Sequence, residues 1–511
     1  MTRRLLLNFS YLASSQGAAE AMFLVRGMVI ARLLGPTAFG IWSAIRLALI
    51  FSRFTHIGAN TGMMQIAPYA EGAGSIKRAQ AHRRVTSAVS LTGALVAASA
   101  VVLVGGWVPG EGMRHWWWLA AALIVAQQLM LFYCEALASQ REFGWAAAAH
   151  ASFAALSTVG GVVGALWWGL SGFLLALAGS YLIVLAVCGI VGPGFPIPAW
   201  RMRYAMRLVN VGWPIMLGHL LLILLWNIDK VVLWAMRSSE QLGVYAIQSY
   251  FTAGAMLLPA VVAAVMHPHL RMRLGMVTDQ AAAMRPVLLE GTRLLACVAL
   301  PMVGLGALLM HLPIRWLLPA YIEAIEPGRL LMLVSFPSIV ATLAMTVLVS
   351  LSLQRRVIAI RTTSVVVSTA AAVAVMLAGG GLIELAAAVA LGFMVHAAIG
   401  LACALHTVQA TRTEAAALLA VVVGQYVALA MLTPMLLVWI PDEPTGLADD
   451  VTRSLLRCAV MLALLAPLGW STWRRMQPPR TQTADDDVAR ATTTPLPGAS
   501  GKVQPHDAIR P

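Results

Sequence analysis

Four charged residues in the first sixty positions lie inside apolar sequence that is long enough to cross a bilayer. Glu20 and Arg26 fall in the first such segment, and Arg46 and Arg53 fall in the second. A charge near the bilayer centre costs about 2.5 to 3.5 kcal/mol on insertion scales, so these residues are expected to face a wet cavity lined by protein. Guanidinium groups suit phosphate oxygens because they bind them in a bidentate way. The cluster therefore predicts a cavity that handles an anionic substrate.

The spacing of these residues indicates how they share one wall. Arg46 and Arg53 are seven residues apart, which places them within about 20° of each other on a helix face. Arg26 is expected at the depth of Arg46 because the two helices run antiparallel, and Glu20 is expected near the level of Arg53. We predict that all four face the substrate. The alternatives are buried ion pairs between helices, or an Arg53 side chain that extends to the membrane surface.

A second group of charges lies in the middle of the chain. Asp229 and Lys230 are adjacent, so their side chains point about 100° apart and one of them is expected to face the cavity. A salt bridge between helices within the second half of the chain is the equal alternative. We expect local pairing or interfacial solvation for Glu135, His150, Glu290 and Arg293, and satisfied core positions for His219 and His396.

The elements that must position these residues are membrane-spanning helices. The chain has 511 residues, of which 60% are hydrophobic and 11% charged, whereas soluble domains are about 25% charged. Continuous apolar runs of about 20 residues exclude an outer-membrane barrel. The fold class is therefore all-α and polytopic, with fourteen expected spans near 9–33, 38–60, 85–108, 115–138, 145–168, 171–192, 208–236, 243–267, 286–311, 327–353, 357–380, 382–409, 415–440 and 452–474.

The basic residues predict the orientation of these spans. Lysine and arginine are concentrated in alternate loops, so the N- and C-termini are both expected in the cytoplasm, with an even number of spans. The net charge of +14 lies mostly in these short loops, and we expect no nucleic-acid partner. The segment after Met1 is predicted to be an uncleaved first span and not a signal peptide.

An internal repeat divides the chain. Phe39-Gly40-Ile41-Trp42-Ser43-Ala44 resembles Leu242-Gly243-Val244-Tyr245-Ala246-Ile247 at an offset of 203 residues. Transporters built from parallel repeats bind their substrate between the halves. We therefore predict six-helix lobes at 1–195 and 196–410, two additional helices at 411–476, and a disordered cytoplasmic tail at 477–511.

Motifs of enzymes and metal sites are missing from the sequence. It contains no Walker A, GxSxG or HExxH pattern, and its five cysteines show no CxxC spacing. The expected outer loops are too short to hold a catalytic domain. We predict a protein that is not an enzyme and that uses no cofactor or metal.

Several short motifs also resemble a known family. They are Asn8-x-x-Tyr11, Ile30-Ala31-Arg32-Leu33-Leu34-Gly35-Pro36-x-x-Phe39-Gly40, Ile228-Asp229-Lys230, Leu242-Gly243-Val244-Tyr245, Pro259…Pro268 and Leu317-Leu318-Pro319-Ala320-Tyr321. In order and spacing, over roughly residues 1–410, they resemble the bacterial polysaccharide (O-antigen-type) flippases of the multidrug/oligosaccharidyl-lipid/polysaccharide exporter superfamily. The last two expected spans depart from the twelve-span pattern, and fourteen is the count of the related lipid II flippases.

The resemblance implies a transporter in the bacterial inner membrane. Such proteins move undecaprenyl-diphosphate-linked oligosaccharides to the outer leaflet by alternating access, for polysaccharide and lipopolysaccharide biosynthesis. Their expected partners are the lipid-linked substrate, membrane lipids, and polymerase and glycosyltransferase machinery. Arg26, Arg46 and Arg53 fit the cationic cavity of such a protein. Protonation or cation binding at Glu20 or Asp229 is expected to couple the cycle to an ion gradient.

Two other functions compete with this interpretation. A drug/cation antiporter of the same architecture predicts an acidic cavity, which the excess of intramembrane arginine opposes. A membrane glycosyltransferase or polymerase predicts a large outer loop with catalytic side chains, which the short outer loops oppose.

Overall fold

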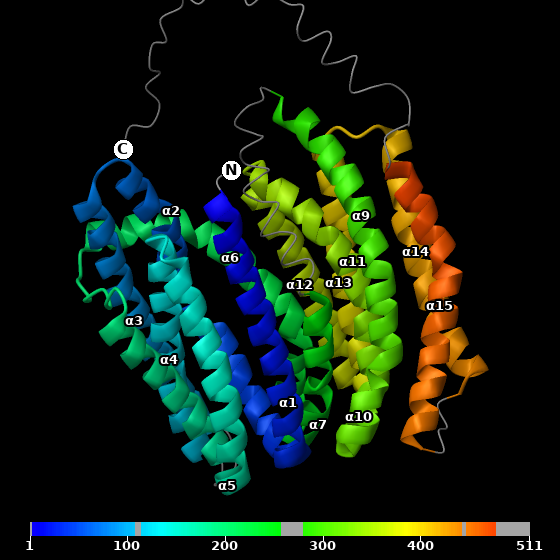
Figure 1. Cartoon of the computed structure of the whole chain (residues 1–511), viewed down its shortest axis with the longest axis horizontal. Coiled ribbons are helices and arrows are strands. Elements are labelled where there is room, and N and C mark those ends of the chain that lie inside the picture. Colours follow the sequence, from blue (N-terminus) through cyan, green and yellow to red (C-terminus); the bar gives the residue numbers. More distant parts are fainter. Residues whose placement is uncertain (1–2, 108–113, 257–278, 442–445, 477–511) are drawn as a thin grey trace, which may run out of the picture.

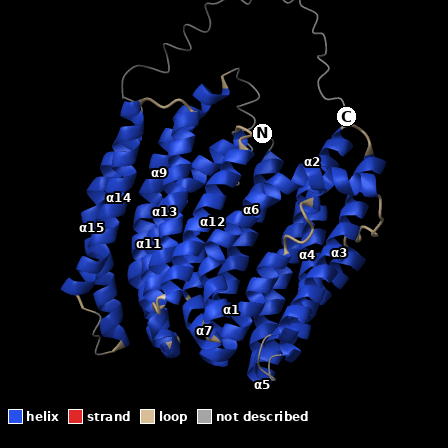
Figure 2. Cartoon of the chain, turned by 180° about the vertical axis from the view of Figure 1, so that it is seen from behind, coloured by secondary structure: helices blue, strands red, loops and turns tan. Residues whose placement is uncertain are grey.

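The computed structural model describes residues 3–107, 114–256, 279–441 and 446–476. This part of the chain is helical and contains no strand (Figures 1 and 2), which confirms the all-α class. Its elements are α1 (Arg3–Ser52), α2 (Ala59–Gly72), α3 (Ile76–Trp107), α4 (Arg114–Ser139), α5 (Phe143–Val191), α6 (Met202–Met236), α7 (Ser239–Ala246), α9 (Gln280–Leu309), α10 (His311–Leu317), the 3-10 helix η2 (Pro319–Ala324), α11 (Ile325–Ser350), α12 (Gln354–Leu377), α13 (Leu382–Thr407), α14 (Arg412–Trp439) and α15 (Leu447–Met476).

Helices α1 and α5 each contain two spans. A straight helix of 50 residues would be about 75 Å long, more than twice the thickness of the hydrocarbon core. The helical path is broken at Gly35 in α1, where φ is 72°, and at Trp168 and Gly169 in α5. Figure 1 shows that α1 descends from the N-terminus while α2, which follows it, lies back at the top. The chain reversal expected between the spans at 9–33 and 38–60 is therefore confirmed, and it lies at Gly35.

The number of spans agrees with the sequence prediction as far as the described residues allow. They contain eleven helices that are long and apolar enough to cross a membrane, and α1 and α5 each count twice. The eighth expected span, 243–267, runs past Met256 and lies partly outside the described residues, as do Pro259 and Pro268 of the family resemblance.

The second expected span, 38–60, ends differently from its prediction. Helix α1 ends at Ser52, and a turn leads to α2, which continues to Gly72. The break follows from left-handed backbone at Ile57 and Gly58, with φ of 50° and 86°. The carbonyl oxygen of Ser52 accepts from the Thr55 N–H at 3.0 Å, and the Nε2 of Gln128 in α4 donates to it as well, which ties the helix end to α4. Arg53 therefore lies at a break in the helix and not within a straight span.

The helices form two groups with a further pair at one edge. We call α1–α5 the first lobe and α6–α13 the second lobe; α14 and α15 lie beyond the second lobe, next to α9 (Figures 1 and 2). The lobes meet through α1 with α7 and through α2 with α6. The described start of α1 and the end of α15 lie at the same side of the molecule in Figure 1, which we call the N-terminal face.

The two copies of the repeat pack against each other at the opposite face. A methyl group on Gly40 would lie 1.6 Å from the carbonyl oxygen of Ser239, and one on Gly243 would lie 1.9 Å from that of Pro36. The offset of 203 residues that relates the two glycines also relates Pro36 to Ser239. The contact between the lobes is therefore nearly symmetric, and it requires glycine at both positions.

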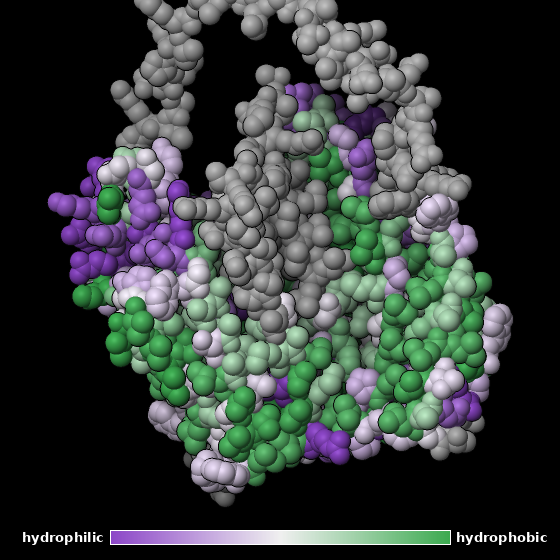
Figure 3. All heavy atoms as spheres, in the orientation of Figure 1, coloured by the Kyte–Doolittle hydropathy of each residue, from purple (hydrophilic) through white to green (hydrophobic). Residues whose placement is uncertain are grey.

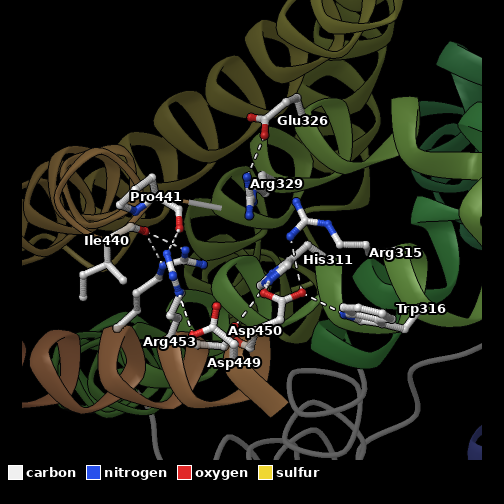
Figure 4. Close-up of polar contacts among 12 residues, drawn as sticks. His311, Arg315, Trp316, Glu326, Arg329, Ile440, Pro441, Asp449, Asp450 and Arg453 are labelled. Carbon is white, nitrogen blue, oxygen red and sulfur yellow. Dashed lines mark hydrogen bonds and ion pairs between the residues drawn. The ribbon is translucent and has the colours of Figure 1, made fainter. Parts of the chain in front are cut away.

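A buried polar cluster attaches α15 to the second lobe (Figure 4). The Asp450 carboxylate accepts hydrogen bonds from Trp316 Nε1 at 2.8 Å and Arg315 Nη1 at 3.3 Å, and it lies 3.1 Å from His311 Nε2. Asp450 and His311 are fully buried. Arg457 of α15 is also buried and donates to the carbonyl oxygen of Ile440 at 2.6 Å. These contacts hold α15 at the face opposite the N-terminal face.

The outer surface is that of a multi-pass membrane protein. In Figure 3 apolar residues make up much of the coloured surface beside and below the grey atoms, and hydrophilic residues gather over α2 and the start of α3. Many large apolar side chains are exposed on the long helices, among them Val159, Leu166, Leu182 and Leu455. Such extensive exposed apolar surface is suited to lipid and not to water.

Candidate functional site

Two adjacent chambers lie at the junction of the lobes. The near chamber, of about 410 Å³, is lined by α1, α2, α4, α6 and the first residues of α12, so it lies toward the N-terminal face. The far chamber, of about 640 Å³, is lined mainly by the second lobe, with α1 contributing Arg46 and Ile50. The walls that both chambers share are formed by Ile50, His219, Ile223, Val349 and Arg361.

The near chamber joins charged groups from both lobes. Arg53 enters it from the end of α1, and Arg361 enters it from α12. The Nη1 of Arg361 donates to the carbonyl oxygen of Gly218 in α6 at 2.5 Å, which fixes the guanidinium at the shared wall. Glu135 of α4 also lines this chamber, and its buried Oε2 has no hydrogen-bond partner among the described residues.

The far chamber carries two further cations. The guanidinium carbon of Arg46 lies 4.9 Å from the centre of the Tyr250 ring, a cation–π contact that orients it. Tyr250 is itself held against α1, because a methyl group on Gly27 would overlap its ring. Lys230 lines the same chamber from α6. Both lobes therefore contribute cations to the far chamber.

Asp229 and Lys230 bond to each other. The Nζ of Lys230 lies 3.0 Å from Asp229 Oδ1 and donates to the carbonyl oxygen of Trp226 at 3.2 Å. Only 2% of Asp229 and 8% of Lys230 is exposed. Lys230 reaches the chamber wall, as expected for one residue of the two. The salt bridge joins neighbours within α6, whereas the expected alternative was a salt bridge between helices.

The other two residues singled out in the sequence lie apart from the chamber walls. Arg26 donates to Ser157 Oγ of α5 at 2.6 Å, and its guanidinium carbon lies 4.7 Å from the Phe23 ring centre, so it packs within the first lobe. Glu20 is exposed and interacts electrostatically with Arg46, Arg26 and Arg53.

Arg361 is the chamber residue that sequence reasoning missed. Helix α12 begins at Gln354, three residues before the span expected at 357–380, so Arg361 lies two turns inside the helix. His219 and His396 were expected in the core. His396 is buried and also lines the far chamber, whereas His219 is exposed to both chambers. The distance of Arg361 from the helix start was the available signal.

The described residues contain no cluster of three or more His, Cys, Asp or Glu side chains that could hold a metal ion.

Comparison with protein families shows which family the chain belongs to. Residues 29–321, more than half of its length, match the family described as "Polysaccharide biosynthesis protein". The chain belongs to this family. The family resemblance drawn from its short motifs is thereby confirmed.

Solved structures show the fold of this polysaccharide biosynthesis protein. It is similar to a multidrug resistance MATE family transporter of the MOP superfamily in an inward-facing conformation, with a TM-score of 0.65 and 14% identity over 76% of this chain and 95% of that one. The lipid II flippase MurJ, in an inward closed conformation, matches with a TM-score of 0.64 and 12% identity over 89% of this chain and 99% of that one. A MOP superfamily transporter from Pyrococcus furiosus matches with a TM-score of 0.58 and 14% identity over 80% and 95% of the two chains.

At these identities the likeness establishes the fold and not the substrate. Comparison with curated protein sequences gives no match. The polysaccharide biosynthesis protein therefore has the fold of MOP superfamily transporters, and its substrate has to be argued from its own residues.

Proposed function

We propose that this protein is a flippase that moves an undecaprenyl-diphosphate-linked oligosaccharide across the bacterial cytoplasmic membrane by alternating access. The observation that carries the proposal is the charge of the two chambers. Arg46 and Arg53 of the first lobe and Arg361 of the second lobe line them. Lys230 adds a cation whose charge Asp229 compensates, and Glu135 is the remaining carboxylate on the described walls.

A net positive cavity favours a diphosphate over a cationic drug. Arginine binds phosphate oxygens through paired hydrogen bonds, and a cavity shielded from bulk water strengthens these contacts. The match to the polysaccharide biosynthesis family supports the same choice against the antiporter alternative. The polyprenyl tail remains in the bilayer while the headgroup crosses between the lobes.

The exposed basic residues support entry of the headgroup from the cytoplasm. Lys77, Arg78 and Arg84 are exposed near the N-terminal face, as are Arg201 and Arg203. By the positive-inside rule this face lies in the cytoplasm, with both termini. The near chamber lies toward this side, and the Gly40–Gly243 contact closes the other side. Separation of the lobes there would deliver the headgroup to the outer leaflet, where polymerase machinery uses it.

An ion gradient drives the cycle in this proposal. Glu20 interacts with three arginines, so its protonation would make the substrate site more positive. Asp229 is the second candidate for coupling, because release of Lys230 toward an anion would leave its buried carboxylate to bind a proton or a cation. Arg26 supports the site by contact with α5 and Glu20 and not as part of a chamber wall.

Complementation of a bacterial strain that lacks its flippase tests the proposal. We expect the wild-type chain to restore surface polysaccharide. Arg53→Ala and Arg361→Ala should each reduce it at least tenfold, whereas the lysine variants keep part of the activity because they keep the charge. Arg356→Ala is the matched control, since Arg356 is exposed on the same helix and bonds to Thr407 outside the chambers.

Membrane levels of each variant are measured first. Normal polymer from both alanine variants would disprove a substrate role for these arginines. A wild-type chain that restores no polymer in the source organism's own deletion strain, but that lowers drug susceptibility, would favour the antiporter.

A further inference from the structure

The far chamber differs in chemistry from the near chamber. One wall, on α11, presents Ser338, Thr342 and Thr346, which are four residues apart and so lie on one face at intervals of about 6 Å. Two of these hydroxyls donate to backbone carbonyl oxygens of the preceding turn, Thr342 to Ser338 at 3.0 Å and Thr346 to Thr342 at 2.8 Å. Ser338 donates in the same way to Val334, at 3.2 Å.

The direction of these bonds determines what the wall can bind. A hydroxyl group has one proton and two lone pairs, so a hydroxyl that donates to the backbone offers only its oxygen to a ligand. Asn227 adds one more acceptor: one N–H of its Nδ2 donates to the Ile223 carbonyl oxygen at 2.8 Å, and its Oδ1 and second N–H remain for a ligand. The α11 wall itself is a row of acceptor oxygens, which suits a ligand rich in hydroxyl donors better than an ionised phosphate.

An aromatic ring forms the neighbouring wall. Trp226 of α6 is half-buried and lines the chamber, and the buried Phe393 of α13 packs on it with ring centres 4.6 Å apart at 57°. Phe393 thereby holds the indole in place. A fixed indole face gives the C–H groups of a sugar ring an apolar surface to stack on, while the hydroxyls at the ring edge reach polar partners.

Three buried polar atoms on the walls of this chamber have no partner within the described part of the chain. They are Ser249 Oγ, His396 Nδ1 and Arg361 Nε. Buried polar atoms in proteins are nearly always hydrogen-bonded, so unpaired ones on a cavity wall indicate a ligand or water that completes them. Ser249 and His396 line the far chamber and not the near one, whereas Arg361 lies on the wall that the two chambers share.

We infer that the far chamber is a carbohydrate subsite that holds the first sugars of the oligosaccharide. The diphosphate is held at the shared wall by Arg361, with Arg53 on one side and Arg46 on the other. The inference rests on the proposed function, and it assigns glycan recognition to Trp226 and the α11 hydroxyls. It implies that the flippase selects its substrate by sugar and not by the diphosphate alone.

The test compares two lipids that differ only in sugar. The first is undecaprenyl diphosphate, and the second is the lipid-linked oligosaccharide that accumulates when the source bacterium lacks this chain. Binding of each to the full-length protein in nanodiscs is measured for the wild type, for Thr342→Val combined with Thr346→Val, and for Trp226→Leu. Thr369→Val is the matched control, because Thr369 donates to the Val365 carbonyl oxygen in the same way but lies on α12 outside the chambers.

We expect the wild type to bind the oligosaccharide lipid more tightly than undecaprenyl diphosphate. The double valine variant and Trp226→Leu should each lose about tenfold in affinity for the oligosaccharide lipid and nothing for undecaprenyl diphosphate, as expected for one or two lost contacts. Unchanged binding of the sugar-free lipid shows at the same time that the variants are folded. Arg361→Ala should weaken the binding of both lipids.

The failures of the two proposals are distinguishable. Equal wild-type affinity for the two lipids, or variants that lose both lipids or neither, would overturn the carbohydrate subsite while leaving the flippase proposal intact. If no lipid-linked oligosaccharide accumulates on deletion, or if the wild type binds neither lipid, the flippase proposal itself is overturned.

Discussion

Substitution of either repeat glycine by alanine should open the contact between the lobes. Helices α1 and α7 approach so closely that a methyl group on Gly40 would lie 1.6 Å from the Ser239 carbonyl oxygen, and one on Gly243 would lie 1.9 Å from that of Pro36. Both neighbours are backbone atoms, which have no rotamer to change. Relief therefore requires movement of a whole helix.

The size of the effect follows from these distances. Ordinary contact begins at 3.4 Å, so the helices must separate by about 1.5 to 1.8 Å. Overpacking of this kind costs about 1 to 3 kcal/mol. Because the cost falls only on the state in which the contact is closed, the equilibrium should shift toward the open state by about 5- to 150-fold.

Cysteine labelling measures this shift. Ser249→Cys, in the far chamber, is introduced into a chain whose five native cysteines are replaced, and a membrane-impermeant maleimide is added to intact cells. We expect Gly40→Ala and Gly243→Ala to raise the rate at which the cysteine introduced by Ser249→Cys is labelled. Gly179→Ala is the control, because a methyl group there meets no atom within 4 Å.

Two results of the labelling experiment would refute this prediction. If Gly40→Ala protein reaches the membrane at normal levels and labels at the rate of the control, the contact does not gate the far chamber. If Gly40→Ala and Gly243→Ala change the labelling rate in opposite directions, the two glycines do not contribute alike to closing the contact, despite its near symmetry.

Two polar contacts support predictions about stability. Arg83 is buried and forms an ion pair with Glu71 at 2.6 Å, so Arg83→Met should lower the melting temperature in detergent by several degrees, through a loss of about 3 kcal/mol. Arg84 is the exposed neighbour, and Arg84→Met should change the melting temperature little. Equal effects of the two substitutions would show that the buried ion pair does not stabilise the fold. Asp450→Asn should destabilise the attachment of α15 by a similar amount, whereas Asp449→Asn removes an ion pair that is one-third exposed and should cost under about 1 kcal/mol. A melting curve in which Asp450→Asn matches the wild type would show that the cluster in Figure 4 does not hold α15.

The sequence alone determined the helices and the presence of a polar interior. Runs of apolar residues predicted most spans to within a few residues where the structure describes them, because a helix in lipid must satisfy its own backbone and cannot be shorter than the bilayer. The span expected at 38–60 is an exception, since α1 ends at Ser52. The break between the first two spans falls at Gly35 for a local reason, since only glycine readily adopts a φ of 72°. The excess of arginine over carboxylate within spans also predicted the sign of the cavity charge.

Only the tertiary structure decided which charges share the cavity. Periodicity shows that a helix face avoids lipid, but it does not show which neighbour covers that face. Arg26 and Arg46 both lie within apolar helices on faces expected to avoid lipid. Arg26 nevertheless donates to Ser157 of α5, whereas Arg46 lies on the chamber wall over the Tyr250 ring. Arg361 is far from the other cations in the sequence, and it joins them because α12 packs against α6 beside Gly218. Long-range packing between helices therefore made the site, because a partner hundreds of residues away leaves no trace in the local pattern.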